Sequence, residues 1–266
     1  MELFDRHRAR YKHGSEEEYT LQEYLEICKN DHSAYAHAAE RLLEAIGEPE
    51  TIDTRDDPRL SRIFSNKVIK LYPAFKDFYG MEESIEQIVS YLKHAAQGLE
   101  EKKQILYLLG PVGGGKSSLA EKLKSLMERV PFYAIKGSPV NESPLGLFSP
   151  EEDGQILEED YGIPARYLNT IMSPWAVKRL REFNGDVTQF KVVKLYPSVL
   201  QQIGVAKTEP GDENNQDISS LVGKVDIRQL EHYSQNDVDA YSFSGGLCMA
   251  NQGLLEFVEM FKAPIK

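Results

Sequence analysis

One stretch decides the fold of this chain: Gly110-Pro111-Val112-Gly113-Gly114-Gly115-Lys116-Ser117. It matches the pattern G-x-x-x-x-G-K-[ST], the phosphate-binding loop of proteins that bind ATP or GTP. Before it, residues 104–109 (Gln-Ile-Leu-Tyr-Leu-Leu) predict a buried strand, and after it residues 117–129 carry apolar side chains at helical spacing. Strand, glycine loop and helix in this order predict the phosphate-loop unit of an α/β protein.

Each residue type in this loop has a physical role in holding a triphosphate. The three successive glycines lack a Cβ atom, so the backbone can turn several N–H groups toward one anion. The following helix adds its unpaired first-turn N–H groups and the positive end of its dipole. Lys116 supplies a charge for the β- and γ-phosphates and is a catalytic candidate, and the Ser117 hydroxyl is a candidate ligand of Mg²⁺. We therefore expect ATP and Mg²⁺ as cofactors; a glycine turn that merely caps a helix would leave the Lys-Ser pair unexplained.

A second acidic motif is expected on a later strand. Phosphate-loop ATPases normally carry an apolar strand that ends in Asp-Glu, where the Asp holds Mg²⁺ and the Glu polarises the attacking water. Residues 253–260 (Gly-Leu-Leu-Glu-Phe-Val-Glu-Met) fit best, with Glu259 at the place of the catalytic Glu and Val258 at the place of the Asp. Glu256 shares a strand face with Val258 and is a candidate for the missing metal ligand. Since valine cannot hold Mg²⁺, hydrolysis is expected to be weak unless another acid compensates, and an ordinary acidic strand remains the alternative.

The composition limits the classes of function. The chain has 266 residues, of which 41% are hydrophobic, and this is enough for a substantial core. Its net charge of −11 opposes non-specific binding of nucleic acid. No apolar run approaches the roughly twenty residues needed to span a bilayer. These features predict a cytoplasmic protein that binds neither nucleic acid nor membrane.

The rest of the chain predicts helices first and mixed elements later. Thr20-Leu-Gln-Glu23 is a capping box, and apolar stripes at helical spacing follow in residues 35–46 and 85–96. Further along, residues 132–135 and 187–195 predict strands, and residues 174–184 predict a helix. Ser-Pro pairs recur between these elements, and turns or helix starts explain them better than phosphorylation sites do. The pairs are Ser138-Pro139, Ser143-Pro144, Ser149-Pro150 and Ser173-Pro174.

With these motifs in place, the chain resembles the N-terminal half of the bacterial PrkA-type serine protein kinases, which are built around an AAA+ module. The resemblance covers nearly the whole chain. It rests on Leu3-Phe4 with Arg10-Tyr11 and on the blocks 38–43, 46–49, 78–82 (Phe-Tyr-Gly-Met-Glu), 110–118, 221–231 and 250–266. The last two blocks are specific to this family, whereas many families share the phosphate loop.

The resemblance implies a fold and further site residues. The fold is an α/β phosphate-loop NTPase of the AAA+ type with a three-layer parallel sheet. A helical N-terminal region, residues 1–75, precedes a nucleotide-binding core, residues 76–266. Ser118 joins the nucleotide site, and Tyr79, Gly80 and Met81 stand where AAA+ proteins hold the adenine. Residues 221–246 fall where one AAA+ clade inserts a hairpin that touches partner proteins.

The same resemblance implies that the core sheet is incomplete. In the AAA+ strand order 5-1-4-3-2, residues 104–109 are strand 1 and residues 254–259 are strand 3. Strand 4, the sensor residues, the arginine finger, the helical lid and a kinase-like portion are expected after Lys266. Unpaired backbone groups in a buried sheet cost roughly 1–3 kcal/mol each. We therefore expect this fragment alone to bind nucleotide weakly and to hydrolyse it poorly.

The leading functional prediction is an ATP-driven AAA+ module that serves a serine/threonine protein kinase. The full-length protein is expected to form a homo-oligomer and to act on protein substrates. One alternative is a nucleotide-gated interaction module without catalysis, which Val258 favours, or an AAA+ ATPase without kinase activity. Another alternative is a phosphate-loop transferase for a small molecule, which the long N-terminal region and the late second motif disfavour.

Overall fold

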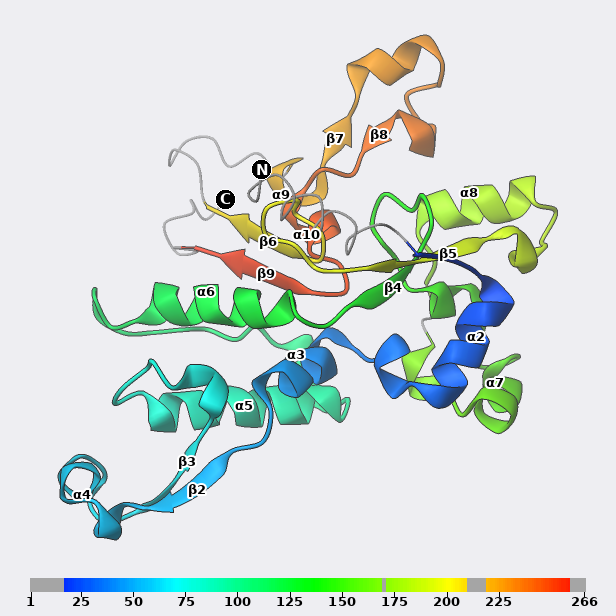
Figure 1. Cartoon of the computed structure of the whole chain (residues 1–266). Helices are drawn as coiled ribbons and strands as arrows, with labels where there is room; N and C mark the ends of the chain where they lie inside the picture. Colours follow the sequence, from blue (N-terminus) through cyan, green and yellow to red (C-terminus); the bar gives the residue numbers. More distant parts are fainter. Residues whose placement is uncertain (1–16, 169–170, 210–218, 259–266) are drawn as a thin grey trace, which may run out of the picture. The chain divides into compact units, whose positions relative to one another are not determined.

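Figure 1 shows the computed structural model of the chain, which describes residues 17–168, 171–209 and 219–258. The chain divides into two compact units. One unit is His37–Val130, and the other combines the segment that ends at Ala36 with the segment that begins at Pro131. The predicted domain boundary between residues 75 and 76 lies inside the unit His37–Val130. This boundary stays a prediction. In the described ranges, no helix has both the length and the apolar character needed to cross a bilayer.

The unit His37–Val130 is centred on three helices. In it α3 (Ala38–Ile46) packs on both α5 (Glu82–Ala96) and α6 (Lys116–Met127). The apolar stripe predicted in residues 85–96 is confirmed as the buried face of α5, and the stripe predicted in residues 35–46 is confirmed in part, since α3 starts at Ala38 and buries Leu42 and Ile46. Leu42, Ile46, Ile85, Val89, Leu119 and Leu123 are all buried.

A small hairpin interrupts the region that the sequence predicts to be helical. Its strands are β2 (Glu50–Asp53) and β3 (Val68–Leu71), which pair antiparallel, with the short helix α4 (Pro58–Phe64) between them. Strand β3 lies along α5, where Lys70 Nζ is 2.7 Å from Glu86 Oε1. The prediction of an all-helical N-terminal region is therefore wrong at this point.

The other unit contains an antiparallel sheet of β1 (Glu17–Thr20), β5 (Lys191–Leu195) and β4 (Phe132–Ile135), in the order β1-β5-β4. Strand β1 runs directly into α2 (Leu21–Asn30). The predicted capping box forms there, since Glu23 N–H donates to Thr20 Oγ1 at 3.2 Å and the Glu23 carboxylate accepts from the Thr20 N–H.

A hydrophobic core joins the start of the chain to segments that come much later. Helix α2 packs against α7 (Gly154–Tyr161), and the sheet contributes its inward side chains to the same core. The members include Leu21, Tyr24, Leu25, Cys28, Tyr133, Leu157, Ile163, Tyr167 and Val192. The N-terminal segment is thus part of the unit that holds β4 and β5.

One parallel strand pair is present in the described residues, formed by β6 (Val205–Thr208) and β9 (Leu254–Phe257). The two strands lie side by side in Figure 1. The strand predicted at residues 254–259 is thus confirmed over residues 254–257, as β9, and Glu259 lies outside the described residues. The predicted large three-layer parallel sheet is not seen in the described part of the chain, where every sheet has two or three strands.

An arm extends between the short helices α9 (Ser219–Val222) and α10 (Gly246–Met249), and it is orange in Figure 1. Its base is the antiparallel pair of β7 (Lys224–Val225) and β8 (Tyr241–Ser242). The hairpin expected in residues 221–246 is therefore present.

Ion pairs hold this arm on α8 (Pro174–Glu182). Lys178 Nζ lies 2.7 Å from Asp237 Oδ1 and 2.6 Å from Asp239 Oδ2, and Arg179 Nη2 lies 2.9 Å from Asp239 Oδ1. Hydrogen bonds to Asp237 and Asp239 raise the pKa of Lys178, and the bond from Lys178 lowers the pKa of Asp237. Because the pKa of Asp237 is lowered on folding, its contribution is present at neutral pH and is lost as the pH falls through that lowered value.

We expect Lys178→Ala to loosen the arm without unfolding the unit, because partly exposed ion pairs contribute only about 1 kcal/mol or less each. Hydrogen–deuterium exchange should accelerate in residues 224–242 and stay unchanged in β4 and β5. Arg181→Ala removes another cation of α8 and is the matched control. Equal exchange of the arm in both variants would contradict this role of Lys178.

Candidate functional site

The glycine loop has the backbone that the sequence predicts. Gly113 and Gly115 adopt φ angles of +79° and +76°, in the left-handed region that favours glycine. Gly115 is the N-cap of α6, and Lys116 and Ser117 lie in the first turn of that helix. The exposed N–H groups of this first turn therefore stand at the end of a glycine loop, as anion binding requires.

Lys116 folds back over the loop that precedes it. Its Nζ donates to the carbonyl oxygens of Gly110 and Pro111, at 2.7 Å each. These two carbonyls hold the positive charge of Lys116 at the glycine loop. A phosphate oxygen could replace either carbonyl as the acceptor of a hydrogen bond from the Lys116 ammonium. The donor set of glycine N–H groups and one ammonium thus fits a phosphate chain.

The prediction of a buried strand in residues 104–109 is wrong for this structure. None of these residues lies in a strand, and Ile105 and Leu109 are 76% and 83% exposed. The physical reason is that a strand of a parallel sheet needs hydrogen-bonded neighbours, and no described strand pairs with this segment.

The three candidate adenine residues directly precede α5, and they differ in exposure and in contact with the glycine loop. Tyr79 is 87% exposed, and Gly80 has a φ of +76°. Met81 lies against the phosphate loop, because a Cβ atom added to Gly115 would be 3.0 Å from Met81 Sδ. The structure therefore places Met81 at the end of the glycine loop and leaves the Tyr79 ring exposed.

The acidic residues of the second motif lie on or just after β9. Glu256 is in this strand, and its Oε2 atom is buried. The Val258 N–H donates to the Thr208 carbonyl at 2.9 Å, which continues the β6–β9 ladder. Glu259 lies outside the described residues. Since β9 and the glycine loop belong to different compact units, the catalytic and metal roles of Glu259 and Glu256 stay predictions.

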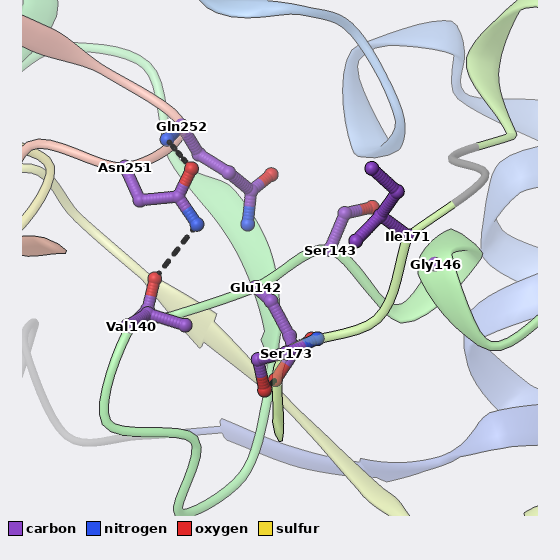
Figure 2. A pocket seen from close by; sticks show the side chains of 8 residues that line it. All are labelled: Val140, Glu142, Ser143, Gly146, Ile171, Ser173, Asn251 and Gln252. Carbon is purple, nitrogen blue, oxygen red and sulfur yellow. Dashed lines mark hydrogen bonds between the residues drawn. The ribbon is translucent and has the colours of Figure 1, made fainter. Parts of the chain in front are cut away.

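A polar cavity of about 220 Å³, which no motif indicated, lies near the start of β9 (Figure 2). Glu142 accepts hydrogen bonds there from Ser138 Oγ (2.9 Å), Ser173 Oγ (2.6 Å) and Ser173 N–H (3.1 Å). Ser173 Oγ also accepts from Ala176 N–H as the N-cap of α8. Of the serines in the Ser-Pro pairs, Ser138 is therefore held in the turn after β4 and Ser173 in the N-cap of α8. The cavity is lined by Val140, Glu142, Ser143, Gly146, Ile171, Ser173, Asn251 and Gln252.

Two amide side chains join this cavity to β4. Asn251 Nδ2 donates to the Val140 carbonyl at 2.8 Å, as Figure 2 shows. Gln252 Nε2 donates to the carbonyls of Tyr133 and Asn141, at 3.0 and 2.7 Å. These amides tie the turn after β4 to the turn before β9, a link between distant segments that local sequence patterns cannot reveal.

A glycine loop that opens a helix, in a mixed α/β chain, is typical of phosphate-loop nucleotide-binding proteins. The family model of the PrkA AAA domain matches residues 19–266, so the chain belongs to the PrkA AAA family. The predicted resemblance is thereby confirmed.

Curated relatives carry two different names. The chain is 72% identical, over an alignment of 270 residues, to the serine/threonine kinase YeaG of Escherichia coli strain K12, and equally to that of Escherichia coli O157:H7. It is 35% identical over 259 residues to the ATP-dependent protease PrkA of Bacillus subtilis strain 168. The first alignment covers 100% of this chain and 42% of YeaG, and the second covers 93% and 38%. The chain thus spans about two fifths of the length of these relatives. No solved structure matches it.

Proposed function

We propose that this chain is the ATP-binding module of a serine/threonine protein kinase. Nucleotide at residues 110–118 changes the shape or the assembly of the module, and another part of the longer protein phosphorylates protein substrates. The observation that carries the proposal is the Lys116 ammonium, held at the glycine loop by the carbonyls of Gly110 and Pro111. The 72% identity to a protein named serine/threonine kinase supports the kinase context.

In this proposal each part of the glycine loop has one task. The N–H groups of Gly113 and Gly115 bind phosphate oxygens, and Lys116 neutralises the β- and γ-phosphates. The Gly114 N–H, which donates to the Pro111 carbonyl at 3.1 Å in the structure, joins them by exchanging that carbonyl for a phosphate oxygen. Ser117 ligates Mg²⁺, which keeps several water ligands and needs few protein groups. Bound ATP supplies a γ-phosphoryl group that can be transferred or hydrolysed. The N–H groups of Val112 and Ser118 complete the donor set, and Pro111, which has no N–H, shapes the start of the loop.

The nucleoside end of ATP lies, in our proposal, beside Tyr79, Gly80 and Met81. The contact of Met81 with the Gly115 position supports this assignment. Glu259 polarises the attacking water, and Glu256 stands in for the Asp that Val258 replaces. Because valine offers Mg²⁺ no ligand, hydrolysis by the module is slow.

A second candidate is an ATP-driven module of a protease, and the name of the Bacillus subtilis relative favours it. A third is a nucleotide-gated interaction module without catalysis, which Val258 favours. Family membership weighs against a small-molecule phosphotransferase. Self-assembly of the longer protein into a homo-oligomer is part of the first proposal.

Radiolabelled ATP and casein distinguish these candidates. We expect the longer protein to transfer label to casein or to itself, and we expect residues 1–266 alone to transfer none. Casein fragments that appear only with ATP would favour the protease. Tight ATP binding with neither transfer nor cleavage would favour the gated module, and absence of ATP binding would overturn the proposed function.

A further inference from the structure

Helix α4 has a basic face that is open to solvent. Arg59, Arg62 and Ile63 lie on one side of this helix, at the spacing i, i+3 and i+4. All three residues are exposed, and Ile63 is 61% exposed, whereas Phe64 on the other side is buried. Figure 1 shows α4 at the tip of the β2–β3 hairpin, away from α5. We call these three exposed residues the basic face of α4.

The two arginines of this face have no acid of their own. Among the described residues, no ion pair includes Arg59 or Arg62. Two acids beside them are engaged elsewhere, since Asp53 pairs with Arg55 and Asp57 caps α4 by accepting from the Arg59 N–H at 2.8 Å. Arg59 also stands in the first turn of α4, where the positive end of the helix dipole disfavours a cation. An acidic partner would therefore stabilise this face.

Helix α7 has the opposite pattern. Ile156, Glu159 and Asp160 lie on one side of it, again at the spacing i, i+3 and i+4, and all three are exposed. Ile156 is 57% exposed, and the sequence from 151 to 160 has six acids and no basic residue. We call Ile156, Glu159 and Asp160 the acidic face of α7.

The acids of α7 are not balanced within the described part of the chain. The last turn of α7 has Glu158, Glu159 and Asp160 and no basic residue, although the negative end of the helix dipole favours cations there. In the described ranges no ion pair includes any of these three acids, and Glu159 accepts only from the neutral Gln155 Nε2, at 2.8 Å. Their charges repel one another, so a cation from outside would stabilise this turn.

We propose that the basic face of α4 binds the acidic face of α7 of a second copy of this chain. In both faces the outermost residues lie four positions apart, a rise of about 6 Å along the helix. With the two helices antiparallel, Ile63 meets Ile156 while Arg59 meets Glu159 and Asp160. The faces thus match in spacing, in their apolar residue and in the sign of their charge, and such complementarity selects one partner over others.

The distribution of charge favours a second copy as this partner. The unit His37–Val130, which has α4, is close to neutral, so the unit that has α7 holds nearly all of the net charge of −11. Contacts between unlike units of two copies avoid most of the repulsion between the acidic units. Because the two faces differ, the contact is heterologous and builds rings or filaments. This inference rests on the proposed function in one respect, since it specifies a surface for the self-assembly proposed there.

The first test measures self-association of the unaltered protein by sedimentation, without nucleotide. The Debye length falls from about 10 Å in salt of about 0.1 M to about 3 Å in about 1 M, so we expect association to weaken at least about tenfold at the higher salt. Arg59→Glu with Arg62→Glu should weaken it as much at the lower salt, because repulsion replaces attraction. Lys93→Glu with Arg129→Glu makes the same change of charge at exposed sites of the same unit, and this matched control should leave association unchanged.

The second test reverses the other face. Glu159→Lys with Asp160→Lys should also weaken self-association at least about tenfold. An equal mixture of this variant with the α4 variant should associate again, because the reversed α4 face of one variant meets the reversed α7 face of the other, and the two unaltered faces meet as well. Recovery in the mixture is a result that a loss of folding cannot imitate.

The outcomes separate this contact from nucleotide binding. A monomeric unaltered protein, or no recovery in the mixture, would overturn the contact. Unchanged association in both reversed variants would also overturn it and would leave an unrelated acidic protein as the partner of α4. The reversed variants keep residues 110–118 and should bind ATP as the unaltered protein does. Absence of ATP binding by the unaltered protein, with recovery in the mixture intact, would overturn only the proposed function.

Discussion

Lys116→Ala should abolish nucleotide binding. Lys116 is the one charged residue in the sequence from 110 to 118, so a bound triphosphate loses its main counter-charge in this loop. Charge-assisted hydrogen bonds contribute roughly 1.5–3 kcal/mol each, and the loss of two of them weakens binding by at least about a hundredfold. Titration calorimetry with ATP and Mg²⁺ measures this loss.

The variant is not expected to unfold. The carbonyls of Gly110 and Pro111, which accept from Lys116 in the structure, belong to exposed residues, so water can replace the ammonium. Lys122→Ala, on the same helix, is the matched control and should keep full affinity. Retained ATP affinity in Lys116→Ala would exclude the glycine loop as the nucleotide site.

Gly253→Ala should destabilise the parallel strand pair severely. Gly253 precedes β9, and a Cβ atom at this position would overlap the carbonyl oxygen of Gly204. That oxygen also accepts from the Leu254 N–H at 2.9 Å, in the first bond between the two strands. The backbone must separate to admit the methyl group, and we expect a loss of roughly 3–5 kcal/mol in the free energy of unfolding.

Such a loss is a large share of typical domain stability, about 5–15 kcal/mol. It should appear as a lower midpoint of urea unfolding. Gly154→Ala is the matched control, because its new Cβ atom would lie 3.4 Å from Ala165 Cβ and 3.8 Å from Leu168 Cδ1, in ordinary contact. Alanine also favours the helix α7 in which Gly154 lies. Equal midpoints in both variants would show that the β6–β9 approach is less tight than the structure has it.

Elements whose signals are local were predictable from the sequence. The capping box at Thr20 and Glu23 starts α2, and the apolar stripes form α3 and α5. The glycine pattern likewise predicted a tightly turned loop, in which Gly113 and Gly115 adopt left-handed φ angles. In each case the residues that decide the structure lie within about one or two helical turns of one another.

Pairings between distant segments were not predictable in the same way. Strand β1 pairs with β5, and β2 and β3 form a hairpin inside a region predicted to be helical. Short strands carry little periodic signal, and their stability comes from partners that the local sequence does not identify. Residues 104–109 show the opposite failure, in which a local signal predicts a strand that does not form. This segment is strongly apolar, but no described strand pairs with it.

The sequence by itself determined the glycine loop, its lysine and serine, and the helix that follows, because anion binding at a helix start depends on contiguous residues. Only the tertiary structure decided that Met81 touches this loop and that the backbones of Gly204 and Gly253 meet. The physical reason is that burial and close approach depend on which distant segments pack together. No periodicity within one segment contains that information.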